Sequence, residues 1–295
     1  MKRKSKVVRA ESQAAWIFVS PFIILFIAFK VYPIIYSFTM SFKKWNGFGR
    51  ITDVGLNNYI QLLTNDSTYG TAFKNTLIIW VANIMFVVAV GFLLALIINH
   101  HNLPWKSFFR TSFYLPQAVA VVPLCLTFSY IFEYHFGFAN LLLKSLGLST
   151  VDWLLSPNNA MATIISVIIW RTAPWHMVIL LGGMQNIPDS LFEAAEIDGC
   201  NEFKKVRYIT IPVLKPIFFY CFLMGSISSF QLFQEPYVIT KGGPGDSTTT
   251  LSLYMYKSAF EYFKLGYASS ITFVSLVVII ILSIFVLISF RSELE

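Results

Sequence analysis

The chain has 295 residues, of which 56% are hydrophobic and only 13% are charged. Soluble domains contain about 25% charged residues, so this composition excludes a soluble globular protein and indicates an integral membrane protein. The net charge of +7 is not accompanied by a basic, aromatic-rich soluble segment, which excludes nucleic acid as a partner.

Six hydrophobic segments are each long enough to cross the ~30 Å hydrocarbon layer of a bilayer, which takes about 20 helical residues. They cover 14–40, 75–99, 111–132, 161–184, 216–240 and 265–290. Backbone groups in lipid must form hydrogen bonds within their own segment, and each segment is too long for a barrel strand. The predicted fold class is therefore an all-α integral membrane protein with six transmembrane helices.

Basic residues predict the orientation of these helices. The N-terminal tail carries five of them, Lys2, Arg3, Lys4, Lys6 and Arg9. With this tail in the cytoplasm, the four inner stretches hold 12 of the 22 Lys and Arg residues, and the three longer outer loops hold 8. Both termini are therefore predicted to be cytoplasmic. The first apolar segment is longer than the core of a signal peptide and no cleavage pattern ends it, so it is predicted to be retained.

Polar residues inside the predicted spans are the candidates for a solute path. In the fifth span Ser228, Gln231 and Glu235 stand at i, i+3 and i+7 and are expected to share one helical face. Amide and carboxylate groups beside aromatic rings suit a sugar, but Ser and Gln also bond helices together in membranes. Arg171 in the fourth span could instead neutralise Glu235 as a structural pair. The full candidate set is Ser228, Gln231, Gln234, Glu235, Tyr237, Arg171 and Trp175.

A short polar insert at 188–212 separates the fourth and fifth spans. Ser190 followed by Glu193 has the spacing of a capping box, which predicts a helix start, and Gly199 can end that helix in the left-handed conformation. A second short helix is expected near 201–208, stopped by Pro212. The residues alone leave open whether this helix–Gly–helix elbow docks into another protein or is an ordinary solvated loop.

The run LFEAAEIDGCNEFKKVRYITIPVLKP resembles the EAA loop of the membrane subunits of ABC importers. That loop has EAA, three residues, Gly, nine residues, Ile, one residue and Leu-Pro; here Ile211 stands in place of the Leu. The runs FFRTSFYLPQAVAVV, FGFANLLLKSLGLSTVDWLL and TKGGPGDSTTTLSLYMYKSAF resemble the carbohydrate-uptake branch. They are most similar to its first permease subunit, of the maltose, multiple-sugar or glycerol-phosphate type.

This resemblance implies a type I ABC-importer permease fold in the cell membrane of a prokaryote. It implies a segment 1–71, made of the tail, first helix and first outer loop, and a transmembrane domain at 72–290 whose coupling loop is 188–212. The residues expected to contact an ATPase subunit are Glu193, Ala194, Ala195, Asp198, Gly199, Ile209 and Pro212. The implied partners are a second permease subunit, an ATPase dimer, an extracellular solute-binding protein and membrane lipid.

Enzymatic activity is not expected of this chain. It has no G-x-x-x-x-G-K-[ST] phosphate loop, so ATP and Mg²⁺ would be used by a separate ATPase, and no cofactor is expected here. No nucleophile–base pair or metal-ligand spacing supports a membrane enzyme, so no catalytic and no metal residues are predicted. The alternatives are a permease for glycerol-phosphate, amino acids or peptides, and an ion-coupled secondary transporter, for which no inverted repeat is visible.

Overall fold

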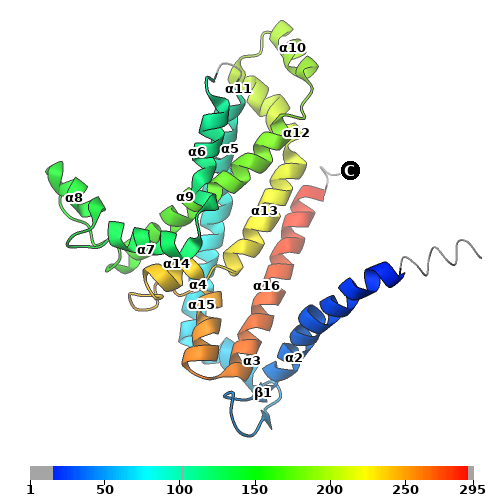
Figure 1. Ribbon diagram of the computed structural model, residues 1–295, viewed down its shortest axis with the longest axis vertical. Coiled ribbons are helices and arrows are strands. Elements are labelled where there is room, and N and C mark those ends of the chain that lie inside the picture. Colours follow the sequence, from blue (N-terminus) through cyan, green and yellow to red (C-terminus); the bar gives the residue numbers. More distant parts are fainter. Residues whose placement is uncertain (1–15, 101–102, 292–295) are drawn as a thin grey trace, which may run out of the picture. The chain divides into compact units, whose positions relative to one another are not determined.

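The computed structural model describes residues 16–100 and 103–291 (Figure 1). The basic tail that carries Lys2 to Arg9 lies outside the described residues, as do the last four residues. Over these ranges the chain is helical apart from loops and one antiparallel hairpin, β1 (Lys43–Lys44) with β2 (Thr52–Asp53), in which Lys43 faces Asp53. The expected all-α class is therefore confirmed, with this hairpin as a small addition.

Within 16–100 and 103–291, five helical segments are long and apolar enough to cross a membrane. They are Trp16–Ser41, Ser67–Asn99, Pro157–Met184, Lys215–Ile239 and Leu265–Phe290. These correspond to five of the six predicted spans. The second of them begins earlier than the sequence indicated, because its first turn is capped by the side chain of Asp66, which accepts a hydrogen bond from Tyr69 N at 2.9 Å.

The third predicted span, 111–132, is not one helix. It is divided between α6 (Lys106–Ala118) and α7 (Val121–Ile131), which meet at an angle of 92°. Val119 and Ala120 between them have extended backbone, with ψ angles of 139° and 134°. An apolar run of the right length therefore does not guarantee a straight span. Length and composition do not predict where one or two residues leave the helical conformation and bend the helix.

The chain falls into two compact units. Unit 1 comprises Met1–Asn65 and Lys257–Phe273, and its described elements are η1 (Ile27–Val31), α2 (Tyr32–Ser41), β1, β2, α3 (Asn57–Thr64), η4 (Lys257–Glu261) and the start of α16 (Leu265–Arg291). Unit 2 comprises Asp66–Tyr256 and Val274–Glu295. It holds α4 (Ser67–Ala82), η2 (Asn83–Val87), α5 (Val88–Asn99), α6, α7, α8 (Phe138–Ser145), α9 (Pro157–Met184), α10 (Asp189–Ile197), α11 (Glu202–Lys205), η3 (Val206–Thr210), α12 (Ile211–Val213), α13 (Lys215–Phe230), α14 (Gln234–Ile239), α15 (Leu251–Tyr256) and the rest of α16.

The core of unit 2 is the packing of α5 against α9, with α13 alongside. Gly91 in α5 makes this approach possible, because a Cβ there would lie 2.7 Å from His176 Cβ and 2.9 Å from Ala173 O. Small residues at helix contacts are typical of membrane proteins, where van der Waals packing drives helix association. The buried cluster around this contact comprises Val88, Ala95, Ile98, Met177, Leu180, Leu181, Met184, Leu214 and Cys221.

The fifth predicted span is interrupted at Gln231–Phe233, between α13 and α14. Non-helical backbone at membrane depth requires partners for its freed carbonyl groups. The segment before and within α15 supplies them, because Ser252 Oγ donates to Phe230 O at 2.8 Å and Thr250 Oγ1 donates to Leu232 O at 2.7 Å. The break is therefore stabilised by side chains about 20 residues further along the chain. Within unit 2, α10 and α11 lie at one end and α15 at the other (Figure 1).

Candidate functional site

The helix break gathers most of the predicted path residues around two adjoining polar cavities of unit 2. The first, of about 320 Å³, is lined by Arg171, Ser228, Gln231, Gln234 and Glu235 among others. The second, of about 410 Å³, adds Trp175. Five residues line both cavities, Asn83, Arg171, Thr172, Ser228 and Gln231, so the two share a wall. We refer to them together as the polar cavities.

The expectation that Ser228, Gln231 and Glu235 share one face of a continuous helix is wrong. Ser228 belongs to α13, Gln231 caps its end with a φ of −93° and ψ of 2°, and Glu235 lies in α14. The interruption nevertheless brings the three side chains to the same cavity. Ser228, Gln231 and Gln234 are exposed at its surface, whereas Glu235 is buried.

Arg171 and Glu235 form the ion pair that the sequence analysis offered as an alternative. Glu235 Oε1 accepts hydrogen bonds from Arg171 Nε at 3.0 Å and from Nη2 at 2.5 Å. The Glu235 side chain is 2% exposed and that of Arg171 is 15% exposed, so the carboxylate is enclosed while the guanidinium still lines the cavity. An enclosed carboxylate needs such a partner, because an isolated buried charge is very costly. The pair ties α9 to α14.

Tyr237 is the one predicted path residue that lines neither of the polar cavities. Its ring stacks on Phe233 with centroids 5.0 Å apart and meets Tyr256 edge-on at 5.3 Å. This aromatic cluster packs α14 against α15, which gives Tyr237 a structural role.

The residues of the polar cavities that were not selected from the sequence include two amides, Asn83 and Gln117. Asn83 is buried, and its Oδ1 has no hydrogen-bond partner among the described residues; the same holds for Oε1 of Gln117. Both line the second cavity. Asn83 begins the π-helix η2, a local irregularity that is frequent at functional sites. The available signal was a lone amide within the otherwise apolar run 77–98.

The elbow of the 188–212 insert is formed by α10 and α11. Gly199 ends α10 with a φ of +72°, and the closing hydrogen bonds run from Gly199 N to Glu196 O at 3.0 Å and from Cys200 N to Ala195 O at 2.9 Å. This pair is the Schellman arrangement, so the prediction that Gly199 ends the helix in the left-handed conformation is confirmed. A Cβ at Gly199 would meet no atom within 4 Å, so the tip of the elbow is open.

Two local expectations about the elbow are wrong. The capping box of Ser190 and Glu193 does not form, because α10 starts at Asp189 after Pro188 and has no side-chain cap. The acidic side chain of Asp189 in the first turn favours the helix start instead. Pro212 does not stop the second helix, because helical backbone runs from Glu202 through the π-helix η3 to Val213. Pro212 is tolerated because it occupies the first turn of α12.

Lys205 holds the two arms of the elbow together. Its Nζ donates to Glu196 of α10 and to Glu202 of α11, both at 2.7 Å, and the Lys205 residue is 7% exposed. The hydrogen bond that Lys205 donates to Glu196 raises the pKa of Lys205 and lowers the pKa of Glu196. Lys205 was not among the residues selected from the sequence, because this contact depends on the angle between α10 and α11.

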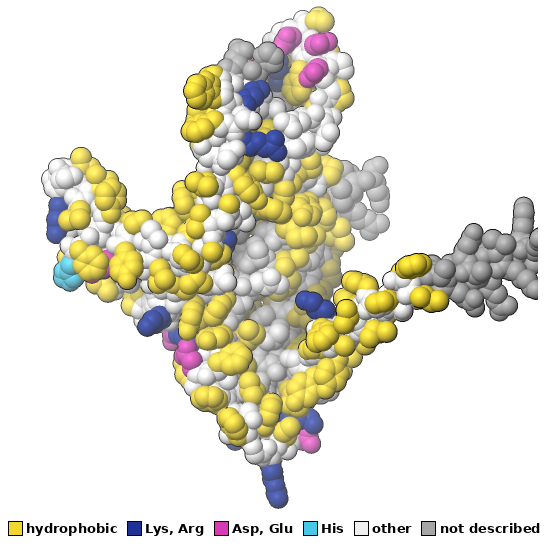
Figure 2. Space-filling model, viewed as in Figure 1, with side chains coloured by type: hydrophobic (Ala, Val, Ile, Leu, Met, Phe, Trp, Pro, Cys, Tyr) yellow, Lys and Arg dark blue, Asp and Glu magenta, His cyan; other side chains and the backbone are white. Residues whose placement is uncertain are grey.

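The surface of the elbow combines acidic and apolar side chains. Figure 2 shows Asp and Glu side chains gathered at the α10 end of unit 2. The predicted contact residues Glu193, Ala194 and Asp198 are exposed, whereas Ala195 is buried and Ile209 and Pro212 are half-buried. Three large apolar side chains that the sequence analysis did not select also stand exposed on the elbow: Ile197 at 87%, Phe203 at 77% and Tyr208 at 72%. Such groups are typical anchors of a protein interface.

Comparison with known proteins identifies the family. The family of binding-protein-dependent transport system inner membrane components matches residues 87–292. The probable ABC transporter permease protein YesP of Bacillus subtilis (strain 168) is 35% identical over 281 residues, 94% of this chain and 90% of that protein. The arabinooligosaccharides transport system permease protein AraP of the same organism is 33% identical over 277 residues, 93% of this chain and 88% of that protein.

A solved structure shows the same fold. The crystal structure of a bacterial alginate ABC transporter, in complex with a periplasmic protein bound to alginate pentasaccharide, contains a chain with a TM-score of 0.85 to this one. The two chains are 22% identical and the match covers 96% of each. The chain therefore belongs to the binding-protein-dependent transport system inner membrane components, the membrane-embedded permeases of ABC importers.

Proposed function

We propose that this permease forms, with a second permease subunit, the membrane path for a sugar or oligosaccharide. The observation that carries the proposal is the pair of polar cavities at an interrupted membrane helix. Discontinuous helices mark substrate sites in transporters, because non-helical backbone is tolerated only where protein or a cavity surrounds it. Hydroxyl groups of a sugar could form hydrogen bonds with the exposed side chains of Ser228, Gln231 and Gln234. They could also donate to Asn83 Oδ1 and Gln117 Oε1, which have no partner among the described residues.

A sugar suits these cavities better than an amino acid or a peptide. Trp175 supplies an aromatic face, the other polar side chains are mostly neutral amides and hydroxyls, and the charge of Arg171 is already compensated by Glu235. A zwitterionic solute would need charged partners of both signs. The relatives named for arabinooligosaccharides and alginate support a carbohydrate, and neither fixes which one this chain carries.

The elbow is proposed to receive force from a separate ATPase dimer, which uses ATP and Mg²⁺. Glu193, Asp198 and Gly199, with exposed Ile197 and Phe203, would contact a groove of that subunit. This function requires the elbow and both chain termini on the cytoplasmic side, with segment 1–71 preceding a transmembrane domain at 72–290. Closure of the ATPase pair would bias the permease pair between inward-open and outward-open states. An extracellular solute-binding protein would deliver the sugar.

The test is uptake by the importer reconstituted with both permeases, the ATPase and the binding protein in proteoliposomes. We expect ATP-dependent uptake of a carbohydrate, and Gln231→Ala should raise the KM about tenfold, a loss of about 1.4 kcal/mol. Val213→Ala, an exposed position outside the polar cavities, is the control. Uptake that needs no ATP, or uptake confined to amino acids or peptides, would overturn the proposal.

A further inference from the structure

A third cavity lies wholly within unit 1 and is lined by none of the residues assigned above. Its volume is about 860 Å³, within the range of roughly 300–1,000 Å³ typical of binding pockets. The β1–β2 hairpin, α3 and the turn that precedes α16 form its walls. The proposed topology places all three of these elements at the extracellular side.

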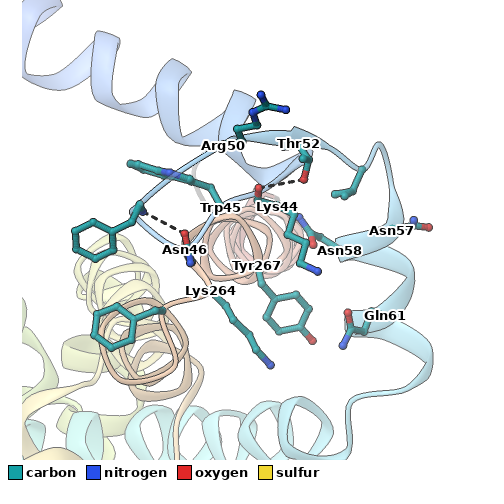
Figure 3. A pocket seen from close by; sticks show the side chains of 13 residues that line it. Lys44, Trp45, Asn46, Arg50, Thr52, Asn57, Asn58, Gln61, Lys264 and Tyr267 are labelled. Carbon is teal, nitrogen blue, oxygen red and sulfur yellow. Dashed lines mark hydrogen bonds between the residues drawn. The ribbon is translucent and has the colours of Figure 1, made fainter.

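Four polar side chains gather on one side of this cavity, from Lys44, Gln61, Lys264 and Tyr267 (Figure 3). Arg50 also lines the cavity, and its guanidinium points away from this group in Figure 3. In the part of the chain that the structure describes, the side chains of Lys44, Gln61 and Lys264 make no hydrogen bond or ion pair. Two ammonium groups and an amide therefore present donors to one region.

Among the residues that the structure describes, no carboxylate lines the cavity to compensate these cations. The acidic residue of the hairpin, Asp53, is already paired with Lys43 at 3.7 Å, and it is not part of the lining. The cavity therefore carries the positive charge of two exposed lysines, Lys44 and Lys264. Two aromatic rings flank it, and both are exposed: Phe48 at 76% and Phe263 at 54%.

Hydrogen bonds connect the elements that form the walls of the cavity. Asn58 Nδ2 donates to Ser41 O at 2.8 Å and to Lys43 O at 3.0 Å, which fixes the hairpin to α3. Leu265 N donates to Trp45 O at 3.0 Å, which fixes the hairpin to the start of α16. The lysines therefore project from a preorganised wall, and preorganisation reduces the entropy lost on binding.

We infer that this cavity is a docking pocket for an acidic side chain of the extracellular solute-binding protein. The inference rests on the proposed function, which supplies that partner and places the cavity outside. Uncompensated lysines beside exposed aromatic rings match an acidic residue flanked by apolar ones, and such charge pairs steer association. The pocket thus gives the partner its orientation on the permease before sugar is released.

The experiment measures association of the binding protein that supports uptake with the complete importer in zwitterionic-lipid nanodiscs. The variant is the double substitution Lys44→Glu with Lys264→Glu. We expect its association rate constant to fall about tenfold at low ionic strength. The difference from the wild type should shrink in high salt, because salt screens charges at the rim of an interface. Lys144→Glu, an exposed lysine of α8 outside the cavity, should leave the rate unchanged.

Three outcomes overturn the inference while leaving the proposed function intact. One is an unchanged association rate in a double variant that melts at the wild-type temperature. The second is loss of co-purified phospholipid in that variant with unchanged association, which would assign the lysines to lipid phosphate. The third is binding of glucuronate to the importer alone, abolished by the variant without any effect on association. Failure of the wild-type importer to bind the protein at all would instead refute the proposed partner.

Discussion

At the scale of single residues, Arg171 and Glu235 have both structural and functional significance. The carboxylate is enclosed, while the guanidinium forms part of the wall of both polar cavities. Removing one partner of a buried ion pair costs about 3–5 kcal/mol, whereas replacing both with neutral groups is often harmless to stability. This asymmetry separates the role of the pair in holding α9 to α14 from its role in the path.

We predict that Glu235→Gln and Arg171→Gln each lower the thermal stability of the purified protein. The double variant should recover much of that stability, because no unpaired charge remains in the interior. If Arg171 lines the route of the sugar, uptake by the double variant stays impaired despite recovered stability. Full recovery of both melting temperature and uptake would show that the pair is structural only.

At the scale of elements, the elbow depends on Gly199 and on Lys205. We predict that Gly199→Asp blocks uptake while the protein remains in the membrane. The uptake rate should fall by about tenfold or more, which corresponds to about 1.4 kcal/mol of coupling free energy. Added bulk and charge at the tip would oppose docking to the ATPase. The matched control is Gly147→Asp, because Gly147 has a φ of +73° against +72° and is equally free of neighbours. Equal loss of uptake in both variants would indicate backbone strain and not docking.

The Lys205 contacts predict how the elbow responds to pH. The pKa of Lys205 is raised, so its stabilising contribution is complete below the ordinary lysine pKa and disappears as pH rises past it. The pKa of Glu196 is lowered, so its contribution is complete above the ordinary glutamate pKa and disappears as pH falls. The contact should therefore hold the elbow between about pH 4.3 and about pH 10.4.

We predict that Lys205→Met accelerates amide hydrogen exchange in α10 at neutral pH and lowers uptake. Lys204→Met is the control, because Lys204 is the exposed neighbour whose side chain forms no ion pair in the described part of the elbow. The difference between the variant and the wild type should diminish as the pH falls below about 4.3 and Glu196, whose pKa is lowered, becomes protonated. Unchanged exchange in Lys205→Met at neutral pH would contradict the role of this contact.

At the scale of the whole molecule, the native cysteines provide a test of orientation. The chain has three, of which Cys125 and Cys221 are buried in helices and Cys200 is half-buried in the elbow. In a permease expressed without the ATPase subunits, we predict that an impermeant maleimide labels Cys200 in inside-out vesicles and spares it in right-side-out vesicles. Ser149→Cys, exposed beyond α8, should show the reverse pattern. Labelling of Cys200 from outside would invert the proposed topology.

The sequence alone was sufficient for the class of protein, five of the spans and the family. Long apolar segments are a local property, since each helix must satisfy its own backbone in lipid. The EAA run is also contiguous, so the turn at Gly199 could be read from neighbouring residues. The pairing of Arg171 with Glu235 could be foreseen only as an alternative. Two opposite charges within membrane spans favour an ion pair, but the sequence does not show whether the helices bring them within contact.

The tertiary structure determined the features that depend on contacts between residues far apart in the sequence. The interruption at Gln231–Phe233 is stabilised because the hydroxyls of Thr250 and Ser252 donate hydrogen bonds to the freed carbonyl groups. The residue pattern within the fifth span does not reveal these contacts. The bend of 92° between α6 and α7 is set at two residues within an apolar run. The same long-range packing brings Asn83 and Gln117 to one cavity. Local pattern determines which segments are helices in lipid, and only side-chain contacts across the fold determine where they break.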